Sequence, residues 1–184
     1  MSSKYYENLI KTVLDSSKGL TWEDAVNEWE IVDCIEDEDG TSVCICGKDG
    51  LRYLYTIRNS ITGISLFPIG STCIKKFERD DLMEEVAVKE KMFKLLHAIN
   101  SKATVELSSE YFSKKLLFAL YKSDVFKPTQ YNKFDGYWDY KFMLDMFNKK
   151  DKSSISPAQR RKINGIIAHS IKPYLINTLK VKTR

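Results

Sequence analysis

Long apolar runs are missing from this sequence of 184 residues. None reaches the roughly 18 residues that a membrane-spanning helix needs. The first residues, Met1 to Tyr6, also lack the apolar core of a secretory signal. We therefore expect a cytosolic protein with no membrane association, in a compartment where thiols stay reduced and disulfides are rare. In that compartment a group of cysteines favours a metal site over a disulfide framework.

Catalytic motifs are missing as well. The sequence contains no serine nucleophile elbow, no H-E-x-x-H pair and no glycine-rich phosphate loop. Acidic residues are plentiful, but their spacing singles out no pair as a general acid and base. We therefore predict that the protein is not an enzyme. Internal repeats and low-complexity segments are also absent from the sequence, and its length suits one medium domain or two small ones.

The net charge of +4 is unevenly distributed along the chain. Residues 1–50 contain 4 basic and 12 acidic side chains, whereas residues 101–184 contain 17 basic and 7 acidic ones. This asymmetry points to a polyelectrolyte or a basic protein surface as the partner. Two solvated faces of opposite sign would produce the same distribution, and the sequence leaves both explanations open.

Four cysteines form the clearest candidate site, around a tight C-x-C-G segment. Cys44 and Cys46 are one residue apart, and Gly47 permits the positive φ angle that such a turn needs. Cys34 precedes this pair, and Cys73 follows it in the first turn of a predicted helix, where the helix dipole favours a thiolate. We predict that all four bind zinc in a tetrahedral site that is closed to water and therefore structural. Four unrelated buried cysteines are the alternative.

A β-hairpin is predicted between these cysteines. Apolar residues alternate over residues 51–58 and again over 64–69, with a turn that contains glycine between them. A helix over residues 4–16 and a short helix capped by Thr21 precede this hairpin. Because the hairpin returns the chain to its starting level, it should bring Cys73 back to the C-x-C pair. Two short strands have too little core to stand alone, so zinc would contribute about 10 kcal/mol of folding free energy.

Helices are predicted from Asp80 onward. One should be capped by residues 108–110, and the last should start at Pro157 and kink about one turn before Pro173. Residues 137–147 are apolar or aromatic on nearly every side, which predicts that this helix forms the centre of a helical core.

The predicted fold class is therefore α+β. A small zinc-stapled β-hairpin unit with flanking helices occupies residues 1–80 and packs on a helical region over residues 81–184. We expect these two parts to form one compact structure.

Two charged segments are candidate partner-binding surfaces. An acidic loop, which we expect to face a basic protein, contains Glu36, Asp37, Glu38 and Asp39. Basic residues flank the start of the last helix and could contact the phosphates of DNA or RNA: Lys149, Lys150, Lys152, Arg160, Arg161 and Lys162. A solvated turn and a solvated helix face are the respective alternatives.

The segment from Trp29 to Phe77 carries a further pattern. It reads W-E-x-x-x-C, then C-x-C-G-K, L-x-Y-L-x-x-I-R-N, T-G and P-I-G-S-x-C-I-K-K-F. This pattern resembles a zinc-binding module of small phage and prophage proteins from low-GC Gram-positive bacteria. Residues 156–175, S-P-A-Q-R-R-K-I-x-x-I-I-x-x-x-I-K-P-Y-L, resemble the helical tail that accompanies the module.

Some phage proteins of this kind are type II anti-CRISPRs, metalloproteins that bind the effector nuclease and block its use of target DNA. The resemblance implies zinc ligation by Cys34, Cys44, Cys46 and Cys73, and action in the bacterial host cytosol. We therefore expect a phage-encoded inhibitor that binds the type II CRISPR effector and prevents the loading or cleavage of target DNA. The alternative is a zinc-containing DNA- or RNA-binding protein that acts through its basic C-terminal helices.

Overall fold

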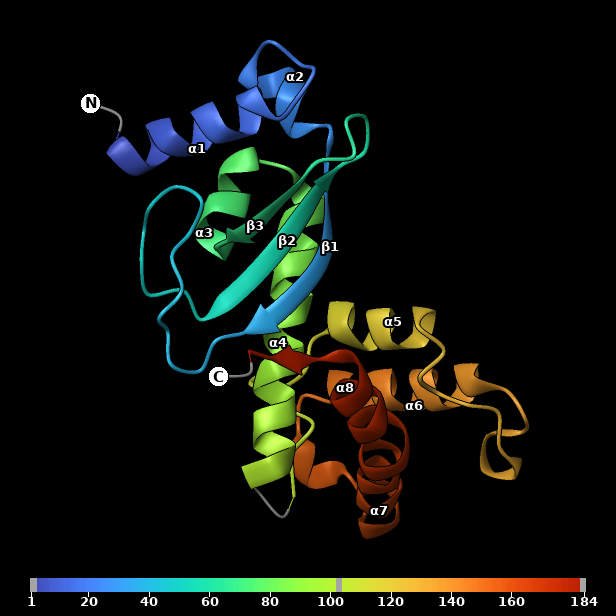
Figure 1. Ribbon diagram of the computed structural model, residues 1–184. Helices are drawn as coiled ribbons and strands as arrows, with labels where there is room; N and C mark the ends of the chain where they lie inside the picture. The colour runs from blue at the N-terminus through green and yellow to red at the C-terminus, as the bar shows by residue number, and fades with distance from the viewer. Residues whose placement is uncertain (1–2, 102–103, 183–184) are drawn as a thin grey trace. The chain divides into compact units, whose positions relative to one another are not determined.

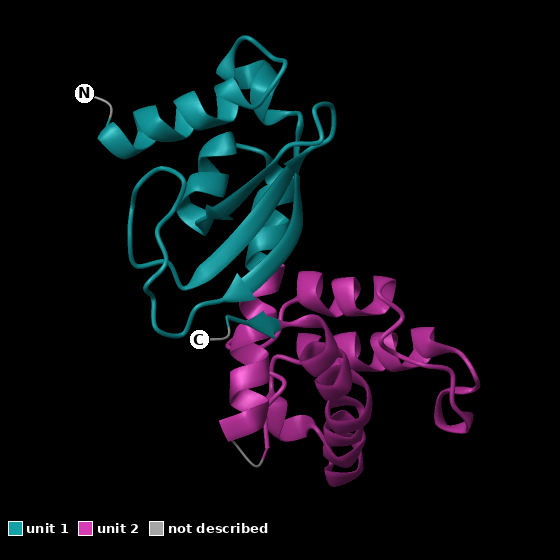
Figure 2. Ribbon diagram, in the orientation of Figure 1, with its two compact units in different colours: residues 1–87, 180–184 teal, residues 88–179 magenta. Residues whose placement is uncertain are grey.

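The computed structural model describes residues 3–101 and 104–182, which divide into two compact units (Figures 1 and 2). Unit 1 consists of residues 1–87 and 180–184, and unit 2 consists of residues 88–179. The division falls inside helix α4 (Asp80–Ser101), several residues after the position expected from the sequence. Unit 1 contains a mixed sheet and unit 2 is helical in its described residues, so the α+β class is confirmed.

The sheet of unit 1 has the strand order β3-β2-β1-β4. Its strands are β1 (Trp29–Glu36), β2 (Tyr53–Asn59), β3 (Ser65–Ile69) and β4 (Lys180–Val181). Strands β1, β2 and β3 pair antiparallel, and the β2–β3 pair is the expected hairpin. Strand β4 was not anticipated, and it pairs parallel to β1.

The core of unit 1 lies between this sheet and the first turns of α4. Trp29, Tyr55 and Ile57 are fully buried. The hydroxyl of Tyr55 donates a hydrogen bond of 3.4 Å to the carbonyl of Val86 in α4, which shows which way the side chain points. A buried tyrosine needs such a partner, because its hydroxyl would otherwise lose its hydrogen bonds to water.

Short helices complete unit 1. They are α1 (Lys4–Asp15), α2 (Trp22–Val26) and α3 (Ser71–Ile74), which runs into a 3₁₀ turn (Lys75–Phe77). As predicted, the Thr21 hydroxyl caps α2 by accepting a hydrogen bond from the amide of Asp24. The ring of Trp22 meets the rings of Tyr6 and Phe77 edge-on, so α1, α2 and the end of the 3₁₀ turn share one aromatic contact.

Unit 2 is built from helices. Besides the later part of α4 they are α5 (Lys114–Lys122), α6 (Gly136–Asn148), α7 (Pro157–Ile166) and α8 (Lys172–Thr178), with 3₁₀ turns at Gln130–Asn132 and Lys152–Ser154. Among the helices of the described residues, none is long and apolar enough to cross a membrane. A π-helical turn (Ile167–Ile171) separates α7 from α8, close to the kink predicted from Pro173.

Two predictions for unit 2 were wrong. Helix α5 begins at Lys114 and is capped by Ser113, rather than by residues 108–110. Helix α6 is not the centre of a core, because Tyr137 and Trp138 are 41% and 43% exposed. Its buried face is narrower than the composition suggested, since tyrosine and tryptophan have polar groups that tolerate contact with water. The exposed aromatic residues of α6 therefore need another explanation.

Candidate metal centre

The C-x-C-G segment forms a tight turn that presents two cysteines together. The amide of Gly47 donates to the carbonyl of Cys44 at 2.7 Å, and the amide of Cys44 donates to the carbonyl of Lys48 at 2.8 Å. Gly47 has a φ angle of +94°, which residues with a side chain rarely adopt. The amide of Ile45 donates to the carbonyl of Pro68 in β3 at 2.9 Å, so the turn is anchored on the hairpin.

Helix α3 brings the third cysteine to this turn. Gly70 precedes the helix and its carbonyl accepts hydrogen bonds from the amides of Cys73 and Ile74. The amide of Gly70 donates to Sγ of Cys44 at 3.4 Å, which fixes the start of the helix against that sulfur. A Cβ atom at Gly70 would lie 2.7 Å from Leu51 Cδ2, so the close approach requires glycine unless that side chain moves.

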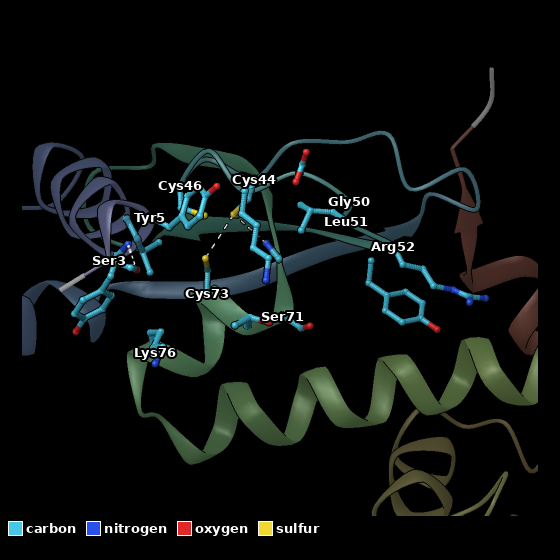
Figure 3. Close-up of a pocket in the computed structure, with 17 residues that line it drawn as sticks. Ser3, Tyr5, Cys44, Cys46, Gly50, Leu51, Arg52, Ser71, Cys73 and Lys76 are labelled. Carbon is cyan, nitrogen blue, oxygen red and sulfur yellow. Dashed lines mark hydrogen bonds between the residues drawn. The ribbon is translucent and has the colours of Figure 1, made fainter. Parts of the chain in front are cut away.

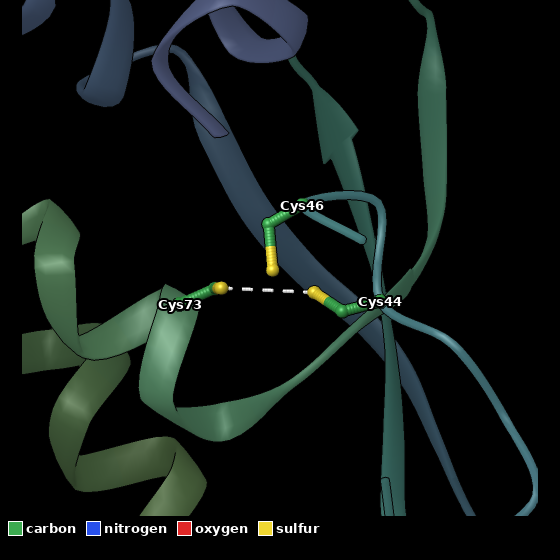
Figure 4. Close-up of side chains that lie close together, drawn as sticks. All are labelled: Cys44, Cys46 and Cys73. Atoms are coloured by element: carbon green, nitrogen blue, oxygen red, sulfur yellow. Dashed lines mark hydrogen bonds between the residues drawn. The ribbon is translucent and has the colours of Figure 1, made fainter. Parts of the chain in front are cut away.

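Cys44, Cys46 and Cys73 lie close together and could bind a metal ion (Figure 4). Their sulfur atoms all lie within 4.8 Å of one another, and Sγ of Cys44 is 3.6 Å from Sγ of Cys73. Cys44 and Cys46 are buried and Cys73 is partly exposed. Thiolates are soft ligands that select metals such as zinc and copper(I) over magnesium or calcium.

The fourth predicted ligand, Cys34, is not part of this group. It lies in β1 directly opposite Tyr55 of β2. Residues that face each other across an antiparallel pair point to the same side of the sheet. The side chain of Cys34 therefore points with Tyr55 towards α4, and it is 4% exposed. The structure thus brings together three of the four cysteines that the sequence proposed.

Contact between the sulfurs of Cys44 and Cys73 shifts their pKa values in opposite directions. Hydrogen bonding with Cys73, supported by the amides of Cys46 and Gly70, lowers the pKa of Cys44 to about 5. The same contact with Cys44 raises the pKa of the Cys73 thiol far above its usual range, with burial as a further cause. The thiolate of Cys44 is therefore favoured beside a protonated Cys73, and a cation bound to both sulfurs would relieve the repulsion that arises when both are thiolates.

A cavity of about 320 Å³ opens beside the sulfurs (Figure 3). Its wall includes the three cysteines, two tyrosines of α1 and basic side chains, among them Tyr5, Tyr6, Lys48 and Lys76. Lys48 and Lys76 supply positive charge next to sulfurs that would carry negative charge. The described residues that line the cavity include no histidine, so they offer the metal no imidazole ligand.

The acidic loop was predicted to be a partner-binding surface, but two of its four acidic residues are not on the surface. Glu36 and Asp37 are buried and form ion pairs with Arg52 and Lys182. The pKa of Asp37 is held well below its usual range, first by the hydroxyl of Ser42 and then by Lys182. Glu36 and Asp37 therefore do not belong to a partner-binding surface.

The remaining acidic positions, Glu38 and Asp39, are exposed. Another acid of the first third of the chain, Glu28, precedes β1 at the end of the strand opposite to Glu36, and it is buried. It accepts hydrogen bonds from the amides of Lys18 and Gly19 and from the Asn59 side chain. No local pattern in the sequence indicates this role, because the partners come from distant segments.

Most of the basic residues near α7 hold their own unit together. Lys149 donates to the carbonyl of Ser154, Arg160 to that of Lys152, and Lys162 pairs with Asp139. Lys152 donates to the carbonyls of Met146 and Phe147 in the last turn of α6. Burial lowers the pKa of Lys152. Lys150, Arg160 and Arg161 are the exposed members of the set.

Comparisons of the chain with protein-family models, with curated proteins and with solved structures find no match.

Proposed function

We propose that Cys44, Cys46 and Cys73 bind a zinc ion that joins the C-x-C turn, the β2–β3 hairpin and helix α3. The convergence of three sulfurs from segments far apart in the sequence supports this proposal. Amide hydrogen bonds to the Cys44 sulfur favour its thiolate, which is the form that binds metal. Zinc bound in this way would contribute about 10 kcal/mol of apparent free energy to the folding of unit 1.

Three protein thiolates leave the tetrahedral ion one further position. Because Cys34 points towards α4, we propose that water or a donor within the neighbouring cavity completes the coordination. This arrangement replaces the closed four-thiolate site expected from the sequence. The zinc remains structural in this proposal, since its ligands tie together the turn and the helix that would otherwise have little shared core.

We further propose that the protein acts by binding another macromolecule, as an inhibitor of the type II CRISPR effector nuclease. The resemblance of residues 29–77 to the zinc module of phage proteins supports this function, and the three clustered cysteines belong to that segment. The charge of unit 1 adds support, because residues 1–87 and 180–184 contain 12 basic and 17 acidic side chains. An acidic surface would speed encounter with a basic nuclease and orient it.

The test is programmed DNA cleavage by a type II effector, with the protein added before or after the target DNA. Inhibition only when the protein is added first would show that it blocks DNA loading. Reversal of the exposed pair, Glu38→Lys with Asp39→Lys, should weaken inhibition more than Glu7→Lys, an exposed reversal on α1. Unchanged cleavage at large molar excess, in either order, would contradict the proposal for that nuclease.

A further inference from the structure

Unit 2 exposes several aromatic side chains on helices α5 and α6, which lie side by side (Figure 1), and in the segment between them. The exposed fractions are 50% for Phe118, 82% for Tyr131, 73% for Phe134, 41% for Tyr137 and 43% for Trp138. Single exposed apolar residues are common, but a group of large aromatic residues on one pair of elements often marks a binding surface. We call these five residues and their ring neighbours Tyr121 and Tyr140 the aromatic face.

Five of the seven rings of this face, those on α5 and α6, are in contact with one another. Tyr121 of α5 stacks on Tyr140 of α6, with ring centroids 4.7 Å apart and planes inclined by 15°. Phe118 and Tyr137 each contact Tyr140, and Tyr137 meets Trp138 edge-on at 5.8 Å. These contacts join the five rings into one cluster across the two helices. A preorganised set of rings loses little conformational entropy when a flat ligand stacks on it.

Positive charge is interleaved with these rings. Residues 113–141 contain six lysines, all exposed: Lys114, Lys115, Lys122, Lys127, Lys133 and Lys141. The acids of the same stretch are Asp124, Asp135 and Asp139, and Asp139 is buried and paired with Lys162. The ammonium group of Lys133 lies 4.9 Å from the centre of the Trp138 ring, which is a cation–π contact.

The loop before α6 contains one exposed lysine and one exposed aromatic residue with unusual main-chain conformations. Lys133 and Phe134 both have positive φ angles, of 58° and 60°. This conformation costs free energy for residues with a side chain, and it persists here next to the buried Asn132, whose amide donates to the carbonyl of Lys127 and to Asp139. Both side chains are exposed, and the ring of Phe134 follows directly in the sequence after the lysine whose ammonium group lies over Trp138.

We propose that the aromatic face binds single-stranded nucleic acid. Bases would stack on the exposed rings, and the surrounding lysines would contact phosphates. The charge of the whole unit suits this ligand, since residues 88–179 contain 17 basic and 8 acidic side chains. A paired duplex fits less well, because its bases are already stacked on one another. This surface is distinct from the basic residues near α7, most of which contact their own chain.

Fluorescence anisotropy of labelled oligonucleotides tests the proposal on the full chain. One arm uses single-stranded DNA, a second uses RNA of the same sequence and a third uses the DNA duplex. Both single strands should bind more tightly than the duplex at low salt, and their affinity should fall as a power of the salt concentration. A difference between the first two arms would show which sugar the face prefers.

Phe134→Ala and Trp138→Ala should each weaken single-strand binding by about 10-fold, as expected when a stacking ring is removed. Phe134 is 73% exposed and Trp138 is 43% exposed, so the variants should fold, and their circular dichroism and melting curves would show it. Arg161→Ala, an exposed basic residue on α7, is the matched control and should bind as the unchanged protein does. The absence of single-strand binding at low salt, or loss with Arg161→Ala but not with the ring variants, would overturn the proposal. A face that binds only other proteins would give the first of these results.

Discussion

The ammonium group of Lys182 lies 3.2 Å from the carboxylate of Asp37, which is 145 positions earlier in the sequence. The amide of Lys182 also donates to the carbonyl of Glu36 at 2.7 Å. Lys182 therefore fixes the end of β4 against β1 through both its main chain and its side chain. A second ion pair, between Lys180 and Asp33 at 2.9 Å, lies on the same pair of strands and is more exposed.

Lys182→Met should lower the melting temperature of the protein more than Lys180→Met. Asp37 is buried and would lose its cation, whereas the side chains of Lys180 and Asp33 are 64% and 43% exposed. Exposed ion pairs contribute about 0–1 kcal/mol, so Lys180→Met is the matched control. Thermal unfolding followed by circular dichroism compares the two variants. Equal melting temperatures would show that the main-chain bonds of β4 suffice.

Cys73→Ser and Cys34→Ser should differ in metal content. With three ligands in the cluster, Cys73→Ser removes a sulfur that the metal needs, whereas Cys34→Ser removes one that points towards α4. Elemental analysis of the purified proteins should find about one zinc ion per chain in the unchanged protein and in Cys34→Ser, and a large loss in Cys73→Ser. Zinc loss should also lower the melting temperature sharply, because binding and folding are coupled.

Equal loss of zinc in both variants would instead support the four-thiolate site that was predicted from the sequence. A protein that melts in the same way with and without zinc would contradict the structural role. These two results can be told apart, since the first concerns ligand number and the second concerns folding free energy.

The local structure around the cysteines of unit 1 could be predicted from the sequence, but which cysteines lie together could not. The turn at Cys44, the hairpin and the start of the helix at Cys73 depend on residues close in sequence. The side of the sheet that Cys34 faces depends on strand register, and β1 is irregular between Ile31 and Asp33. A shift of one residue turns a side chain to the other face, so spacing alone could not place this cysteine.

The burial of Asp37 and the exposure of Trp138 could not be predicted from the sequence either, for physical reasons. The burial of Asp37 depends on Lys182, which reaches it only once β4 has paired with β1. The exposure of Trp138 and its neighbours could not be inferred from composition, since aromatic residues fill cores and binding surfaces equally well.

Glu28→Gln should reduce stability at neutral pH and change its dependence on pH. The Asn59 side chain, followed by the amides of Lys18 and Gly19, lowers the pKa of Glu28 below its ordinary value of 4.5. A carboxyl whose pKa falls on folding stabilises the protein above the unfolded value and loses that effect as the pH drops through the folded value. The gap in melting temperature between the variant and the unchanged protein should therefore be largest near pH 7 and shrink below about pH 4.

Melting curves at several pH values measure this gap. Glu30→Gln is the control, because Glu30 is an exposed acid two positions away in β1. A gap that stays constant from pH 7 to pH 3 would show that Glu28 contributes through packing instead of charge.

Gly136→Ala and Gly165→Ala should change stability in opposite directions. A Cβ atom at Gly136, the first residue of α6, would lie 1.8 Å from the carbonyl oxygen of Phe126, so the main chain itself would have to move. Such overpacking costs about 1–3 kcal/mol. Gly165 lies within α7 with nothing within 4 Å of the added atom, so alanine there should stabilise the helix by about 0.5–1 kcal/mol. Urea unfolding measures both changes. Because α6 carries Tyr137 and Trp138 directly after the first of these glycines, Gly136→Ala should also disturb the aromatic face, while Gly165→Ala should leave it intact.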